Sequence, residues 1–467
     1  MNEKNTKPQP PSQAPIIVWF RNDLRLLDNP ALFHAAEKGP VLALYILDDK
    51  NPGSYFPGRA SLCHLHESLK SLSQSLSNRL LLERGDPLEI LKKLQLQYQA
   101  KGIYWNRLYE PWQMKRDSII KKSFPEIEIK SFQASLLFEP HSISKADGSP
   151  YKVFTPYYKK GCLQAPAPEK PLDKCENPRL VEIPPQNIES LKLLSSAPWE
   201  EKIKAPAGES VAQERLQSFL KDGLKGYKEG RNFPAQNNVS KLSAALHFGE
   251  ISARQIWNAV ENCYFESEKD SEHFLSELGW REFSHYLLYH FPDLPEKNFQ
   301  KKFDNFAWKE DAQALDAWKK GLTGYPFVDA AMQELWQSGH MHNRMRMVTG
   351  SFLIKNLRIH WKEGERWFWD CLKDADLANN SAGWQWIAGS GADAAPYFRI
   401  FNPITQGQKF DPDGDYTLKY LPQLRGIENK YLFCPWESPN FSSFDYPPPI
   451  VDLAKSRDQA LDAFSNL

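Results

Sequence analysis

The first third of the chain alternates short apolar runs with amphipathic stretches. Five apolar runs, rich in β-branched side chains, occupy residues 16–20, 41–47, 80–83, 102–105 and 127–129. After the first run, a helical pattern begins at Pro30. Because strands that alternate with helices of this length form parallel sheets, the pattern predicts a doubly wound parallel-sheet α/β domain. We place this domain at residues 15–137.

The rest of the chain has a different pattern. Prolines interleaved with polar residues dominate 138–206, which predicts an inter-domain linker. Helical periodicity then prevails, in segments 209–223, 252–263, 272–289 and 329–338. It predicts an all-α domain over residues 207–467. Residues 1–14 are polar and proline-rich and are expected to form a disordered leader.

Composition narrows the class of protein. The 58 basic and 58 acidic residues balance, which argues against a uniformly basic nucleic-acid-binding surface but allows a local basic patch. The six cysteines lack C-x-x-C spacing, so we expect neither disulfides nor a metal site, and a cytoplasmic location. No apolar run is long enough to span a membrane and the leader lacks the apolar segment of a signal peptide, so we expect a soluble protein.

Tryptophan is concentrated in the second half. Ten of the fifteen tryptophans lie between Trp257 and Trp386. Such a density favours an aromatic-lined cavity or a stacking platform. The alternative is a helical core that is rich in aromatic side chains.

The most informative stretch is 374–386. Asp376, Asn380 and Trp384 lie at i, i+4 and i+8, so they share one helical face if the helix runs that far. This face offers a carboxylate, a carboxamide and a π-surface to a flat, polar, redox-capable ligand. Protein cores rarely bury such groups without a partner. The alternative is a helix end with an Asn cap and two core tryptophans.

Two more segments repeat this arrangement. Their i, i+3 and i+4 positions hold Glu277, Trp280 and Arg281 in one, and Asn343, Arg346 and Met347 in the other. A pocket lined by Glu, Asn, Trp and Met suits a pair of flat bases that needs hydrogen bonds at one edge and stacking on its face. Either segment alone is equally well explained by an exposed ion pair beside a core tryptophan, but their joint occurrence favours the pocket.

Phosphate-binding candidates are also present. Ser240-Lys241-Leu242-Ser243 precedes a helical run, where hydroxyls bind phosphate or simply cap the helix. Basic side chains able to create a local positive field for DNA phosphates are Lys228, Arg231, Lys241, Arg281, Arg344, Arg346 and Lys355. The glycine patterns at 389–394 and 53–59 lack the context of nucleotide-binding loops and are interpreted as turns.

Two long motifs resemble those of the photolyase/cryptochrome family, and the resemblance covers nearly the whole chain. The first runs from Trp19-Phe20-Arg21-Asn22-Asp23-Leu24-Arg25 to Leu32; the second comprises Trp384-Gln385-Trp386, the run from Asp393 to Arg399, and Phe401-Asn402-Pro403. The resemblance implies an α/β domain followed by a helical domain that binds a U-shaped FAD, which is reduced and anionic when active. By position, the implied flavin contacts are Tyr227, Ser240, Leu242, Ser243, Glu277, Arg281, Asn343, Arg346, Asp374, Asp376 and Asn380.

The resemblance also assigns roles within this site. Asn380 would face the ring nitrogen that changes protonation on reduction. Val239 stands where relatives often carry Thr, which predicts the loss of one phosphate contact, and His340 stands where some carry Trp. The implied electron-transfer tryptophans, ordered from flavin to surface, are Trp384, Trp361 and Trp308.

The implied substrate pocket resembles that of class I cyclobutane pyrimidine dimer photolyases. Its catalytic residues would be Glu277, Trp280, Asn343, Met347 and Trp386. The implied reaction is light-driven repair of a dimer flipped out of UV-damaged DNA, by an electron from excited reduced FAD. The implied DNA contacts come from Arg231, Trp280, Arg281, Arg344 and Trp386.

Other interpretations remain. A signalling cryptochrome would keep FAD and the tryptophans but bind a protein partner; the pocket residues and the lack of a long C-terminal tail argue against it. A conventional flavin or nicotinamide oxidoreductase would need an acid/base pair near the ring and a well-placed glycine-rich turn, and neither is seen. The family also implies an antenna pigment, methenyltetrahydrofolate or 8-hydroxy-deazaflavin, near Asn106, Tyr109, Glu110 and Pro111. We expect a monomer.

Overall fold

The N-terminal part of the chain forms a five-stranded parallel sheet. The computed structural model describes residues 13–175, 177–263, 268–394 and 398–467, so the predicted leader lies almost wholly outside them. The strands are β1 (Ile16–Phe20), β2 (Val41–Leu47), β3 (Leu80–Arg84), β4 (Gly102–Asn106) and β5 (Glu128–Phe132). They lie in the order β3-β2-β1-β4-β5 and every neighbouring pair is parallel, which confirms the doubly wound prediction.

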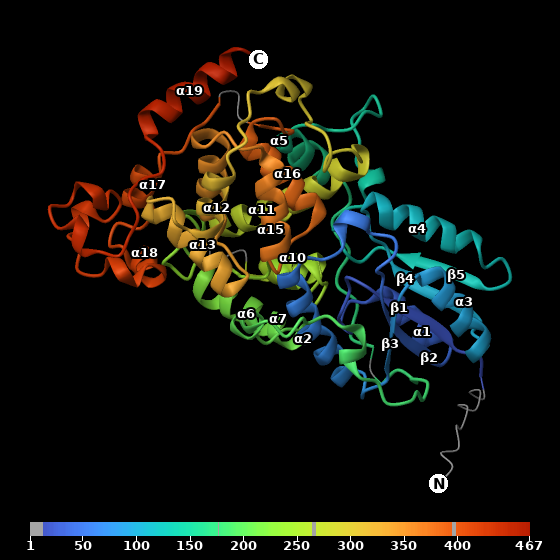
Figure 1. Ribbon diagram of the computed structural model, residues 1–467. Helices are drawn as coiled ribbons and strands as arrows, with labels where there is room; N and C mark the ends of the chain where they lie inside the picture. Colours follow the sequence, from blue (N-terminus) through green and yellow to red (C-terminus); the bar gives the residue numbers. More distant parts are fainter. Residues whose placement is uncertain (1–12, 176, 264–267, 395–397) are drawn as a thin grey trace, which may run out of the picture.

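Helices cover both faces of this sheet (Figure 1). They are α1 (Pro30–Lys38), α2 (Arg59–Ser75), α3 (Pro87–Tyr98) and α4 (Pro111–Lys122). The alternation within β1 divides its side chains between the faces: Val18 packs with α1 and α2, and Trp19 packs with α3 and α4. Both faces are therefore buried, which explains why the inner strands β1 and β2 are continuously apolar.

The remainder of the described chain is helical. Its α-helices are α5 (Phe154–Pro156), α6 (Pro198–Ile203), α7 (Glu209–Ser218), α8 (Tyr227–Gly230), α9 (Ser243–His247), α10 (Ala253–Asn262), α11 (Glu268–His290), α12 (Ala312–Lys320), α13 (Pro326–Ser338), α14 (Asn343–Ser351), α15 (Trp361–Cys371), α16 (Leu377–Ala388), α17 (Pro403–Phe410), α18 (Asp415–Tyr420) and α19 (Leu453–Ser465). None of the described helices combines the length and apolarity needed to cross a membrane.

The segment 138–206, expected to be a linker, is divided between the two halves of the molecule. Phe138, Tyr151 and Phe154 belong to the hydrophobic core of the helical half, where they pack with α11. Further along, Val181 hydrogen-bonds the backbone of Val41 and extends the packing of the sheet. Prolines limit the α-helices here to the short α5 and α6, but the aromatic side chains of Phe138, Tyr151, Phe154 and Tyr157 are buried.

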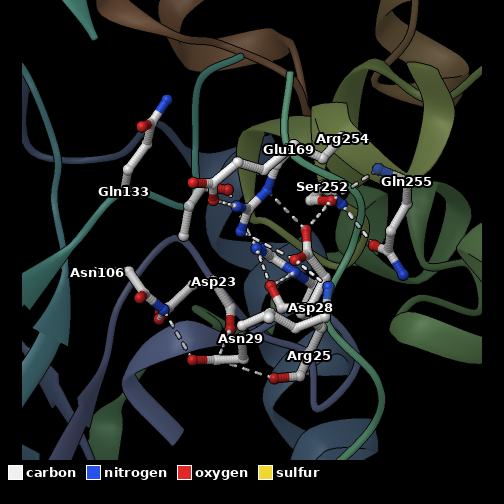
Figure 2. Close-up of polar contacts among 12 residues, drawn as sticks. Asp23, Arg25, Asp28, Asn29, Asn106, Gln133, Glu169, Ser252, Arg254 and Gln255 are labelled. Atoms are coloured by element: carbon white, nitrogen blue, oxygen red, sulfur yellow. Dashed lines mark hydrogen bonds and ion pairs between the residues drawn. The ribbon is translucent and has the colours of Figure 1, made fainter. Parts of the chain in front are cut away.

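A buried polar cluster joins the two halves (Figure 2). Arg25, in the loop after β1, donates to the carbonyl oxygens of Asp28 at 2.8 Å and Gly249 at 2.9 Å. Asp28 accepts from Ser252 Oγ at 2.6 Å and pairs with Arg254 Nη2 at 2.9 Å. Gly249 has φ +65°, and a Cβ there would lie 2.1 Å from a backbone oxygen of that loop. The first sequence motif thus fixes the sheet domain against the helical half.

Candidate functional site

The helical half contains a cavity of ≈ 610 Å³, within the range of cofactor sites. The structure brings every residue of the implied flavin site to its wall: Tyr227, Ser240, Leu242, Ser243, Glu277, Arg281, Asn343, Arg346, Asp374, Asp376 and Asn380. The implied substrate residues Trp280, Met347 and Trp386 line it as well. Segments that are more than a hundred residues apart in the sequence therefore form one site.

Asp376 orients the helix that forms one wall. It is the N-cap of α16, and its carboxylate accepts from the backbone N–H of Asn379 at 2.8 Å. His285 Nε2 lies 3.3 Å and His247 Nδ1 3.8 Å from the same carboxylate. Burial alone would raise the pKa of Asp376, but the two imidazoles hold it well below its usual range. The wall therefore carries a fixed negative charge beside hydrogen-bond donors.

A partly buried ion pair lies nearby. Arg346 Nη2 donates to both carboxylate oxygens of Asp374, at 2.8 and 3.0 Å, and its Nε donates to the carbonyl oxygen of Met341 at 2.9 Å. Burial raises the pKa of Asp374, but the opposing effect of Arg346 and the Ser243 hydroxyl is larger, so the pKa is lowered overall. The ion pair fixes the guanidinium of Arg346 in the cavity wall.

Asn380 is held from behind. Its Nδ2 donates to the carbonyl oxygen of Glu365 at 3.1 Å, and Ser381 Oγ donates to the Glu365 carboxylate at 2.7 Å. Burial raises the pKa of Glu365 to about 7. These two bonds join α16 to α15 and fix the orientation of the Asn380 amide, which can still donate its second N–H and accept at Oδ1.

Four of the five implied substrate residues lie on α11 and α14, and Trp386 lies on α16. Glu277 accepts from Arg231 Nη2 at 2.8 Å. The Trp280 ring stacks on Phe154, with centroids 3.8 Å apart and planes 11° apart. Asn343 is exposed, so its amide is accessible to a ligand. A rigid indole between a carboxylate and an amide can bind a flat, polar ligand.

The three implied electron-transfer tryptophans differ in burial. Trp384 and Trp361 are buried, and Trp308 is half-buried. Gly364 lies one turn after Trp361 on α15, and a Cβ there would lie 2.1 Å from the Trp384 ring, so glycine lets this indole pack directly on the helix. The His360 ring contacts both Trp308 and Trp361, with its centroid 4.8 Å from that of Trp308 and 5.5 Å from that of Trp361.

The structure separates other predicted residues from the cavity. Arg231 and Arg344 do not line it; Arg231 reaches it through Glu277, and Arg344 pairs with Asn232. His340 lies beside Glu334 at 3.4 Å, outside the cavity wall, as does Val239.

The two implied antenna residues, Asn106 and Glu110, have different surroundings. The amide of Asn106 is buried and bonded to Asp23, Asn29 and Ala31, so it has a structural role. Glu110 does line a cavity between the sheet and the helices, near the ends of β1 and β4 where doubly wound folds bind ligands. That cavity is only ≈ 90 Å³, well below the roughly 300 Å³ of a typical ligand site.

Sequence reasoning missed three contributors to the site. His247 and His285 set the charge state of Asp376, and no local pattern distinguishes them from other core histidines. Phe154 supports Trp280 but lies in the proline-rich segment that was interpreted as linker. Its one available signal was an aromatic run, Phe154 to Tyr158, which is unusual for a solvated linker.

The chain is similar to known proteins over nearly its whole length. Family models described as "DNA photolyase" and "FAD binding domain of DNA photolyase" match residues 16–176 and 274–466. The deoxyribodipyrimidine photo-lyase of Agrobacterium fabrum is 44% identical, over 97% of this chain and 98% of that protein. Cryptochrome-2 of Arabidopsis thaliana is 34% identical, over 96% of this chain and 78% of that protein. The crystal structure of a class III photolyase from Agrobacterium tumefaciens superposes with a TM-score of 0.92, at 42% identity, and covers 100% of this chain and 99% of that one.

Proposed function

This chain belongs to the photolyase/cryptochrome family, and on that premise we propose that it repairs cyclobutane pyrimidine dimers in DNA under blue light. The observation that carries the proposal is the single cavity in which the flavin-site and substrate residues meet. Three bacterial relatives, at 44, 37 and 36% identity, carry the name deoxyribodipyrimidine photo-lyase, which favours repair over the signalling alternative.

The cofactor is FAD, and the cavity fits it. The matching C-terminal family model is an FAD-binding domain. The walls supply the hydroxyls of Ser240 and Ser243, the guanidinium of Arg346 and the amide of Asn380, which are suitable partners for phosphate, ribityl and ring polar groups. When bound, FAD supplies the light-driven electron donor. The protein's part is to hold it, exclude water and place the substrate beside it.

The remaining residues bind the substrate. Trp280 and Trp386 pack against the bases of a flipped-out dimer, and Glu277 and Asn343 hydrogen-bond the base edges. Arg231 and Arg344 lie near the same wall and contact DNA phosphates. The partner is UV-damaged DNA, and we propose that the protein acts on it as a monomer.

The class within the family is a separate question. The five substrate residues match the class I pattern, whereas the similar crystal structure is that of a class III photolyase. We therefore propose the dimer as substrate from the pocket itself and do not extend the proposal to class I. The antenna pigment, methenyltetrahydrofolate or 8-hydroxy-deazaflavin, stays a prediction; of the two residues assigned to it, Glu110 lines a small cavity and Asn106 does not.

The direct test is repair of a thymine-dimer oligonucleotide by the purified, reduced holoenzyme, in blue light and in darkness. We expect intact thymines to reappear only in the light. Dimers left untouched by a protein whose spectrum shows bound FAD would exclude repair of this lesion and favour the signalling alternative.

Removal of the Trp280 indole is expected to weaken lesion binding. Trp280→Ala loses base stacking worth about 1–3 kcal/mol, so the dissociation constant for a dimer-containing oligonucleotide should rise roughly 5- to 150-fold. Fluorescence anisotropy in darkness measures this without any contribution from repair. Trp336→Ala, an exposed tryptophan outside the cavity wall, is the matched control and should bind like the wild type.

Trp361→Phe is expected to separate photoreduction from repair. The substitution removes the middle indole of the implied electron-transfer series, between Trp384 and Trp308, and nearly keeps the volume of the core. Light should therefore no longer reduce oxidised FAD at an appreciable rate. Chemically reduced protein should still repair dimers. Absorbance spectra under illumination follow the first property; Trp257→Phe, another buried tryptophan of the helical half, is the control. Equal loss of both activities would point to a structural role for Trp361.

A further inference from the structure

A cluster of two carboxylates and two imidazoles lies at the boundary between the sheet domain and the helical half. Glu110, the residue before α4 in the sheet domain, lines the small cavity at this boundary. His247 and Ala375 line both this cavity and the large one. Asp376, which pairs with His285, lines the large one. Glu110, His247, His285 and Asp376, here called the boundary cluster, thus connect the cofactor wall with a carboxyl group of the other domain.

Glu110 is the member of the cluster whose charge is most easily changed. Its side chain is half-buried, and its Oε2 accepts from Trp112 Nε1 at 2.6 Å. Burial raises the pKa of Glu110 to about 7, and the carboxylate of Asp376 acts in the same direction. The two histidines of the cluster and the Trp112 indole oppose this rise, but by less. A carboxyl group with this pKa is close to half-protonated at neutral pH, so a change in the local charge changes its proton occupancy.

The other charged groups of the small cavity have partners of their own. Arg116 Nη1 pairs with Asp48 at 3.0 Å, and Arg21 Nη1 pairs with Asp117 at 2.7 Å. Tyr55 also lines the cavity, but burial raises the pKa of its hydroxyl far above the neutral range, so it stays uncharged. Because both guanidinium groups are bound to carboxylates of the sheet domain, they do not neutralise the boundary cluster. Its charge depends mainly on its own four members and on what binds in the large cavity.

We propose that Glu110 takes up a proton from solvent when the bound FAD is reduced. Reduction of oxidised FAD by two electrons and one proton leaves a negative charge in the large cavity, whose wall already carries the ionised Asp376. A new negative charge favours protonation of a nearby carboxylate. One further proton therefore passes from water to the Glu110 carboxylate, while the electrons come from an external reductant. Glu110 touches neither substrate nor reacting atoms; it offsets charge from the other domain. This inference rests on the proposed function for its cofactor, and not for DNA or repair.

The test is a spectroelectrochemical titration of the holoenzyme without DNA, from about pH 5 to 9. The slope of the flavin potential against pH counts the protons taken up on full reduction. Because the pKa of Glu110 is about 7 before reduction and higher afterwards, extra uptake should begin near pH 7 and end above the higher value. A rise of one pKa unit would give about half an extra proton at the midpoint of this window. Glu110→Gln, which can still accept from Trp112 but cannot be protonated, should lack the extra uptake. Infrared difference spectra should show a protonated carboxyl band on reduction of the wild type alone.

A second variant keeps the test valid even if Glu110→Gln fails to fold or to retain FAD. Trp112→Phe leaves the carboxyl group in place but removes a hydrogen bond that lowers its pKa, so the window of extra uptake should move to higher pH. Glu126→Gln, at an exposed glutamate after α4, is the control and should behave as the wild type.

Glu365 is the rival proton acceptor, because burial raises its pKa to about 7 as well. Extra uptake that persists in Glu110→Gln, or that disappears only in Glu365→Gln, would overturn the proposal. So would a wild type that takes up one proton at every pH, or a window that Trp112→Phe leaves unmoved. Because the potential is read without DNA, absence of repair in the light would contradict the proposed function and leave this result standing.

Discussion

Replacement of Asp28 by Asn is expected to lower the free energy of unfolding by about 3–5 kcal/mol, because it leaves the buried Arg254 guanidinium without its main counterion. Asp28 is fully buried, and its carboxylate bonds Ser252 Oγ, Arg254 and the backbone N–H of Leu172. Its φ of +52° is left-handed, a conformation that Asn tolerates as well as Asp does. The substitution therefore removes the charge with little change in shape or backbone strain. Urea unfolding of the holoenzyme, followed by far-UV circular dichroism, measures the loss.

The matched control acts on the same arginine. Glu169 pairs with Arg254 Nη1 at 3.3 Å, but its own side chain is 87% exposed. Because surface ion pairs contribute little, Glu169→Gln should change stability by less than about 1 kcal/mol. If the two substitutions cost the same, charge burial is not what holds the sheet domain to the helical half.

This cluster also shows what the sequence could not reveal about the fold. Apolar periodicity was sufficient to predict all five strands and the change to helices, because a buried parallel sheet requires continuous apolar runs. The fifth strand was predicted at 127–129 but occupies Glu128–Phe132, because its half-buried side chains make the apolar pattern less distinct. The structural role of Arg25 and Asp28 was invisible, because their partners Gly249 and Arg254 lie more than two hundred residues away in the sequence.

The same reasoning separates what was predictable in the site. Spacing along a helix placed Glu277 with Trp280, and Asn343 with Met347, because residues three or four apart share a face. Family motifs then brought α11, α14 and α16 to one cavity, which helical spacing alone cannot do. Asn106 shows the limit: an amide buried among three polar partners looks the same in sequence as one that waits for a ligand. Both interpretations of the tryptophan cluster, an aromatic-lined cavity and an aromatic-rich core, describe part of it. Trp280, Trp384 and Trp386 line the cavity, while Trp318 and Trp361 pack in the core.

Replacement of Asp374 by Asn is expected to yield protein almost free of FAD. The carboxylate holds the Arg346 guanidinium in the cavity wall, and removal of one partner of this partly buried ion pair costs about 2–4 kcal/mol. If that cost falls on the bound state, FAD affinity drops by roughly 30- to 1000-fold. Arg346→Lys keeps the charge but loses the separate Nε donor that binds the carbonyl oxygen of Met341, so its loss should be intermediate. The ratio of flavin to protein absorbance, and calorimetric titration of apoprotein with FAD, give both values.

The control and the pH dependence make the prediction specific. Arg366, on the exposed side of α15, pairs with Glu363, and Arg366→Lys should retain FAD fully.

Because the pKa of Asp374 is lowered in the folded protein, its stabilising contribution is present above the usual carboxyl pKa, about 4, and is lost as the pH falls through the lower folded value. Wild-type FAD should therefore resist release at neutral pH and dissociate only on strong acidification, whereas Asp374→Asn should lack FAD across the range. A variant that keeps wild-type flavin content and affinity would show that the ion pair with Arg346 is not what builds the cofactor wall.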